Sequence, residues 1–168
     1  MVIGDSHVRR LAEFRDVLDS KVWNATIDFL HQGGARLDFA IDNAHRAANY
    51  DITVVMLGGN DIGRGSSAAA VAEKTQVAVD ALVQQGSKSV IVMSIWPRND
   101  QSFNRKAAAV SQILDARYHY ERNVNFWVWD RRQPMATYDG VHLLQRGYRR
   151  AARYLVAPIV WTIRHHEH

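Results

Sequence analysis

The chain has 168 residues, a net charge of +4, 47% hydrophobic residues and no cysteine. This length fits one domain, and the composition excludes a disordered or collagen-like chain. The lack of cysteine excludes a disulfide scaffold, thiolate metal ligands and a cysteine nucleophile. No segment approaches the roughly 20 apolar residues of a membrane-spanning helix, so we expect a soluble protein in the cytoplasm.

Strand-like and helix-like patterns alternate along the whole chain. Short runs rich in β-branched residues predict strands, and longer periodic patterns between them predict helices. The expected strands cover residues 2–4, 25–30, 52–57, 89–94 and 124–128. The expected helices cover residues 8–18, 37–48, 67–85, 104–120 and 144–165. This order predicts a three-layer α/β/α domain around a five-stranded parallel sheet of the flavodoxin-like type.

The first expected strand begins at residue 2 and offers about three residues, whereas five or six are usual. We therefore expect residues 1–168 to form a single domain that has been excised from a longer chain.

Polar and glycine-rich residues follow four of the predicted strands. They are Gly4-Asp5-Ser6, Gly33-Gly34, Gly58-Gly59-Asn60-Asp61 and Asp139-Gly140-Val141-His142. In an open parallel sheet, functional groups gather where strands end and loops begin. We therefore expect these four segments to meet at one edge of the sheet.

Together these segments supply every group that acyl transfer needs. A serine hydroxyl requires a base, a carboxylate that orients the base, and donors for the developing oxyanion. We predict Ser6 as the nucleophile, His142 as its base and Asp139 as the orienting carboxylate. Gly34, Asn60 and the backbone N–H of Ser6 are the predicted oxyanion donors.

Structural explanations compete with these catalytic ones. Serine is favoured at the N-cap of a helix, so Ser6 could simply cap the helix that follows. Asp5 and Asp61 are expected to brace their loops through hydrogen bonds to nearby backbone.

The blocks GDS, GG, GGND and DGVH, in this order, resemble those of the SGNH, or GDSL-like, hydrolase family over nearly the whole chain. The resemblance implies a serine esterase that hydrolyses carboxylic esters through a Ser6-His142-Asp139 triad and an acyl-enzyme, without metal or cofactor. The chain departs from the family at His7, where leucine is usual, and this leaves its substrate preference open. Because short loops leave little material for a lid, we expect short acyl groups or a small lipid ester as substrate.

The compact, basic form with GDSH also resembles the esterase domains in first-open-reading-frame proteins of some non-LTR retrotransposons. That resemblance implies association with lipid or membrane within a nucleoprotein particle. Independently, Arg146, Arg149, Arg150 and Arg153 recur at helical spacing and predict one basic stripe. The stripe is either a solvated face or a contact for RNA or an anionic membrane. A binding module that uses this stripe is the alternative to an enzyme.

Overall fold

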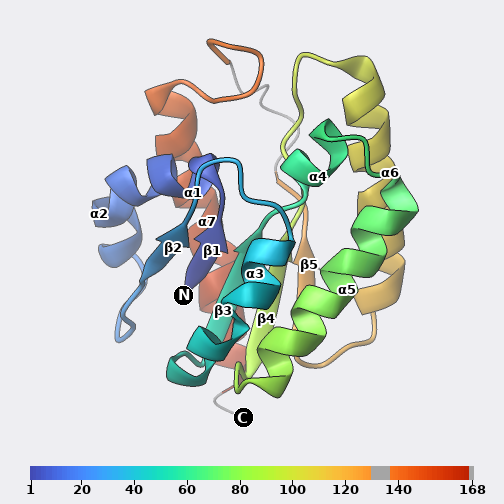
Figure 1. Cartoon of the computed structure of the whole chain (residues 1–168). Coiled ribbons are helices and arrows are strands. Elements are labelled where there is room, and N and C mark those ends of the chain that lie inside the picture. Colours follow the sequence, from blue (N-terminus) through green and yellow to red (C-terminus); the bar gives the residue numbers. More distant parts are fainter. Residues whose placement is uncertain (130–136, 167–168) are drawn as a thin grey trace.

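The computed structural model describes residues 1–129 and 137–166. Within these residues, five parallel strands form one sheet in the order β2-β1-β3-β4-β5 (Figure 1). The strands are β1 (Val2–Gly4), β2 (Phe29–His31), β3 (Ile52–Met56), β4 (Ser89–Met93) and β5 (Val124–Trp127). The reversal of order at β1 is the flavodoxin-like topology, so the predicted fold is confirmed.

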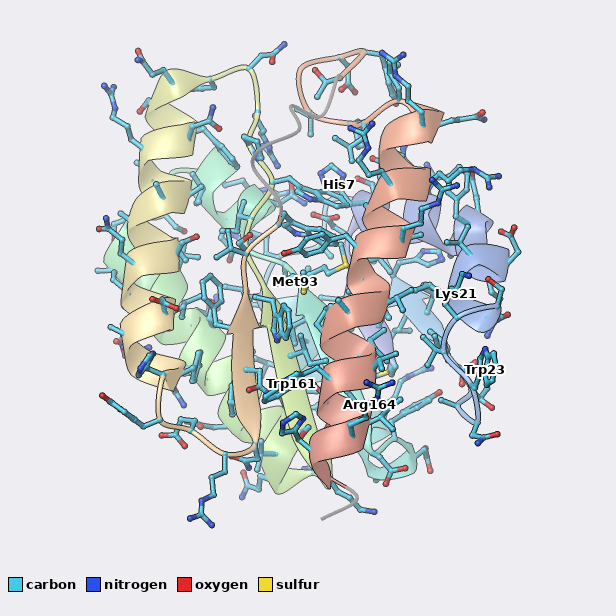
Figure 2. The ribbon with its side chains drawn as sticks, turned by 180° about the vertical axis from the view of Figure 1, so that it is seen from behind. His7, Lys21, Trp23, Met93, Trp161 and Arg164 are labelled. Atoms are coloured by element: carbon cyan, nitrogen blue, oxygen red, sulfur yellow. The ribbon has the colours of Figure 1, made fainter. Side chains whose placement is uncertain are left out.

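Helices cover both faces of the sheet. One face carries α3 (Asp38–Asp42), α5 (Ala68–Gln84) and α6 (Gln101–Tyr118), with the short α4 (Gly59–Gly63) at its upper end. The other face carries α1 (Ser6–Leu11), α2 (Arg15–Asp19) and α7 (Gln145–His166). In Figure 2, seen from behind, α7 crosses this second face. The molecule therefore has the three predicted layers.

Alternation along the central strands divides the core between the two faces. Val54 of β3 and Ile91 of β4 pack with α1, α2 and α7, whereas Val55 and Val92 pack with α3, α5 and α6. All four side chains are at least 97% buried. Because a sheet covered on both faces has no polar side, its strands read as continuous apolar runs, which is why these two were the clearest in the sequence.

The boundaries of several elements differ from the prediction. The expected helix 8–18 begins at Ser6 and is interrupted by a 3-10 turn at Ala12–Phe14, and β2 starts four residues later than expected. A 3-10 segment, Ala44–Asn49, completes the expected helix 37–48. The helix α4 was not expected, because its two glycines predict a loop. None of the described helices is both long and apolar enough to cross a bilayer.

Candidate active site

Ser6 lies at a junction with almost no free space. Gly4 ends β1, and a Cβ there would lie 2.3 Å from Val8 Cγ2 and 2.6 Å from the carbonyl oxygen of Met56. Only glycine fits such a close approach of helix and strand. Asp5 caps α1 by accepting a hydrogen bond from His7 N–H at 2.9 Å, so Ser6 is the first helical residue. We call residues 4–8 the nucleophile junction.

Asp139 and His142 lie on a tight hairpin directly before α7. The hairpin is closed by an isolated bridge between Thr137 and Leu143, and Gly140 adopts a φ of +81° at its tip. Asp139 Oδ1 accepts hydrogen bonds from the backbone N–H groups of Val141 and His142, at 2.9 and 2.6 Å. We call residues 137–143 the base hairpin. One turn thus carries both groups, as their spacing predicted.

The hairpin meets the nucleophile junction in a continuous hydrogen-bonded chain. Ser6 Oγ lies 2.9 Å from His142 Nε2, and His142 Nδ1 lies 2.6 Å from Asp139 Oδ2. Hydrogen bonds from the His142 side chain and from the hairpin backbone lower the pKa of Asp139 below its ordinary value. The ionised carboxylate accepts a hydrogen bond from Nδ1–H of the neutral ring, which leaves the Nε2 lone pair facing the Ser6 hydroxyl. Residues 136 positions apart are therefore in direct contact.

Asn60 connects the other two segments to this centre. Its Nδ2 donates to Asp5 Oδ2 at 3.2 Å and to the carbonyl oxygen of Ala35 at 3.0 Å, while its Oδ1 accepts from Arg98 Nη2 at 3.2 Å. Two acceptors on one side and a donor on the other fix the orientation of the amide. Both amide hydrogens have partners in this arrangement, so an oxyanion would have to share one of them. The longer bond, to Asp5, is the weaker of the two.

Gly34 lies beside Ala35 in the segment that touches Asn60. Its φ of +71° is the left-handed conformation that glycine favours, whereas Gly33 has no positive φ. Within the described part of the chain, the N–H of Gly34 donates to no other atom, and neither does that of Ser6. Both groups are therefore free to donate to a substrate oxygen.

The competing structural explanation is wrong for Ser6, whereas those for Asp5 and Asp61 agree with the hydrogen bonds. Asp5, not Ser6, is the N-cap of α1, so the capping explanation for Ser6 is wrong. Asp61 is 3% exposed, and its Oδ2 accepts from Leu37 N–H at 3.1 Å, so it braces the approach to α3 as well as its own turn. The structural roles predicted for Asp5 and Asp61 agree with these bonds.

Three further residues lie beside the centre, although the sequence did not single them out as site residues. Trp96 and Arg98 follow β4, whose end carries none of the four segments predicted to form the site. His7 contacts Trp96 edge to face at 4.7 Å between ring centroids, and its ring lies 5.4 Å from that of His142. The place of Trp96 and Arg98 directly after a central strand was the signal for these two residues. The departure from the family at position 7 was the signal for His7.

The model of the GDSL-like lipase/acylhydrolase family matches residues 4–150 of the chain. The chain also has an open parallel sheet with a serine and a histidine in contact at its edge. It belongs to this family of ester hydrolases. No curated protein matches the chain with statistical significance.

Solved structures of similar fold cover almost the whole chain. One is a member of the lipolytic G-D-S-L family from Veillonella parvula, with a TM-score of 0.74, 22% identity and 96% of each chain covered. Another is a carbohydrate esterase of family 3 from Talaromyces cellulolyticus, with a TM-score of 0.76, 19% identity, and 98% of this chain and 97% of that one covered. A carbohydrate acetylesterase from Sinorhizobium meliloti has a TM-score of 0.70, 13% identity, and coverage of 95% and 97%. At these identities the likeness establishes the fold alone.

Proposed function

We propose that the protein is a serine esterase in which Ser6, His142 and Asp139 act together. The single observation that supports this most is the unbroken chain of hydrogen bonds from Ser6 Oγ through the His142 ring to Asp139. Nucleophile, base and orienting acid each have a partner at hydrogen-bond distance, which is the geometric requirement for covalent acyl transfer.

The reaction proceeds in two steps. Ser6 Oγ attacks the ester carbonyl carbon while its proton passes to His142 Nε2, and the carbonyl oxygen becomes an oxyanion. The N–H groups of Ser6, Gly34 and Asn60 donate to that oxygen. His142 then protonates the departing alcohol, and an acyl group remains on Ser6. Water, deprotonated by the same imidazole, attacks the acyl-enzyme and releases the acid and the free serine.

Asp139 keeps the imidazole in the useful tautomer throughout. It also stabilises the imidazolium that forms in each step, without taking up the proton itself. Because hydrogen bonds hold its pKa below the ordinary value, Asp139 stays ionised across the neutral and mildly acidic range.

Labelling with a fluorophosphonate tests this proposal. We expect one phosphonylated peptide, containing Ser6, and loss of labelling in Ser6→Ala and His142→Ala. Ser20→Ala, at an exposed serine after α2, is the matched control and should label normally. Labelling that persists in Ser6→Ala, or that maps to another serine, contradicts the proposal.

We also propose that short acyl groups are preferred. The support is the shortness of the loops at the carboxyl ends of β1, β3 and β4. After β1 ends at Gly4, α1 begins at Ser6; after β3 ends at Met56, α4 begins at Gly59; and after β4 ends at Met93, α6 begins at Gln101. Rates with acetyl, butyryl and decanoyl 4-nitrophenyl esters should fall along that series. Faster turnover of the decanoyl ester contradicts the preference.

A second candidate function rests on the basic stripe of α7. Arg146, Arg149, Arg150 and Arg153 are all exposed, opposite the buried Ala151, Ala152 and Leu155. Such a stripe can neutralise phosphates of RNA or of an anionic membrane. The cytoplasmic location and the retrotransposon origin remain predictions. A basic surface of this kind is compatible with both. Salt-dependent retention on RNA or anionic vesicles, lost when the four arginines become glutamine, supports this role, and equal retention of the variant contradicts it.

A further inference from the structure

The tautomer of His7 follows from its contacts. Leu143 N–H donates to the hydroxyl oxygen of Tyr148 at 3.3 Å, and the same oxygen lies 2.9 Å from His7 Nδ1. Tyr148 is 2% exposed, and within the described residues His7 Nδ1 is the acceptor available to its O–H. The tyrosine therefore donates, and His7 Nδ1 accepts. The proton of the neutral ring then sits on Nε2.

The charge state of His7 agrees with this assignment. Burial, followed by the nearby His142, Arg98 and Arg10, lowers the pKa of His7 to about 3. The ring is therefore neutral at physiological pH. Its Nε2–H donates to no atom of the described part of the chain, although it belongs to the residue next to Ser6.

A small cavity of about 30 Å³ lies at this position. We call it the donor cavity; its wall includes Asp5, His7, Gly59, Trp96, Arg98 and Trp129. His7 lies at the upper, carboxyl end of the sheet in Figure 2, above Met93 of β4. The cavity is therefore lined by His7, the residue that directly follows the proposed nucleophile Ser6 in the sequence.

Unused hydrogen-bond donors distinguish this cavity from an ordinary packing void. The indole N–H of Trp96 is buried and has no partner among residues 1–129 and 137–166, and Trp96 is only 6% exposed. The Arg98 guanidinium donates only to Asn60 Oδ1 within the described residues and has four further N–H groups. A buried donor without an acceptor is destabilising, so a ligand that supplies oxygen acceptors would be stabilised here.

We propose that the donor cavity is a subsite for a carboxylate carried by the ester substrate. A carboxylate only accepts hydrogen bonds, so it matches the N–H groups of His7, Trp96 and Arg98, and the guanidinium fork suits its planar pair of oxygens. The size also fits, because the volume holds about two waters or one group of that size. This subsite rests on the proposed esterase function, since it selects among substrates of the same centre.

Of the described residues that line the cavity, Asp5 alone is acidic. Its two oxygens already accept from His7 N–H and from Asn60 Nδ2, so neither depends on the ligand. A neutral hydroxyl group, which could donate to Asp5, is the competing occupant of the cavity.

Matched esters test the subsite by comparing an anion with its uncharged methyl ester. One pair is 4-acetoxy-3-nitrobenzoate and its methyl ester, with the carboxylate on the alcohol side. The other is mono-4-nitrophenyl glutarate and its methyl ester, with the carboxylate on the acyl side. We expect the anion of at least one pair to have a kcat/KM at least tenfold above that of its methyl ester, mainly through KM. Equal values within each pair overturn the subsite.

Variants of residues in the cavity wall test whether these residues determine the ratio of kcat/KM between each anion and its methyl ester. Arg98→Gln should bring the anion-to-neutral ratio to about one to two. His7→Asn keeps an acceptor near Nδ1 but loses the Nε2–H, whereas the longer His7→Gln can restore a donor there. The ratio should therefore be lower in His7→Asn than in His7→Gln. Arg122→Gln, at an exposed arginine before β5 and at the opposite end of the sheet, is the control and should leave the ratio unchanged.

Other outcomes distinguish a failure of the subsite proposal from a failure of the esterase proposal. A preference that survives in both Arg98→Gln and His7→Asn overturns the subsite, as does preference for the neutral hydroxymethyl analogue of the benzoate ester. If no ester is hydrolysed in a Ser6-dependent way, the esterase proposal fails. Binding of glutarate to Ser6→Ala then decides the subsite alone. A saturable shift of the Trp96 indole N–H resonance that Arg98→Gln removes supports it, and the absence of a shift overturns it.

Discussion

The nucleophile junction and the base hairpin meet at the active site, but different interactions hold each of them in place. Packing fixes the junction: Gly4 has no room for a Cβ, Val8 is fully buried, and Asp5 is 4% exposed. The hairpin is held by its own hydrogen bonds and by those to Asn99 N–H and the Tyr148 hydroxyl, and Asp139 is exposed on it. The position of Ser6 is therefore set by the core of the protein, whereas that of His142 depends on a few polar contacts.

Removal of the base gives the largest effect that this comparison predicts. His142→Ala should lower kcat by about 10⁴-fold or more, because the serine then has no group to accept its proton. The free energy of unfolding should change little, since His142 is partly exposed on the hairpin. Ester kinetics and urea unfolding measure the two quantities. A large loss of stability would show that the hairpin, like the junction, is fixed by packing.

Gly4→Ala tests the packed half of the comparison. The added Cβ overlaps Val8 and the Met56 carbonyl, so helix and strand must separate, at a cost of about 3 kcal/mol in unfolding free energy. Gly65→Ala is the control for space, because nothing lies within 4 Å of a Cβ there, although its φ of +100° adds some backbone strain. Urea unfolding of both variants checks this. Destabilisation of Gly4→Ala no larger than that of Gly65→Ala would contradict the packing account, because overlap at Gly4 would then cost no more than backbone strain at Gly65.

Tyr148→Phe tests a buried contact, made by α7, that joins the two halves. Leu143 N–H and His7 Nδ1 would lose their shared partner, which should cost about 2 kcal/mol and lower kcat severalfold as the hairpin loosens. Tyr50→Phe removes a hydroxyl bonded to Asp28 at the other end of the sheet and should leave kcat unchanged. Unchanged kcat in Tyr148→Phe would show that the hairpin positions His142 unaided.

The smallest expected effect is a dependence of stability on pH at the junction. Native His7 has a pKa of about 3, below its ordinary 6.5, so between these values the unfolded chain binds a proton that the folded chain does not. Its contribution is fully present above pH 6.5 and declines as the pH falls toward 3. Between pH 6.5 and 5 the loss should be on the order of 1 kcal/mol, since the ring is partly exposed. His7→Asn should lack this component in urea unfolding, and an identical pH profile would contradict the assignment.

The sequence was most informative where one local rule decides the structure. The central strands β3 and β4 were predicted closely because burial on both faces leaves a continuous apolar run. Ser6, Asn60, Asp139 and His142 could be predicted to meet because parallel strands end at one edge of the sheet. Local patterns cannot show that Asp5, instead of Ser6, caps α1, because both residue types suit that position.

Contacts between side chains far apart in the sequence could not be predicted, for a different reason. The bond between His7 and Tyr148 spans 141 residues and depends on how α7 packs against α1. The N–H of Trp96, which has no partner in the described part of the chain, likewise depends on tertiary packing. The helix α4 formed although glycine disfavours helices, because Ile62 and Asp61 are buried there by tertiary contacts.

The central claim is that Asp139 acts on Ser6 only through His142. Measuring kcat/KM for Asp139→Asn, His142→Ala and the double variant tests it most directly. The account predicts that Asp139→Asn costs about 10²–10⁴-fold in the otherwise native protein, but less than threefold when His142 is already alanine. An equal loss in both backgrounds would contradict it, because the carboxylate would then act without the imidazole.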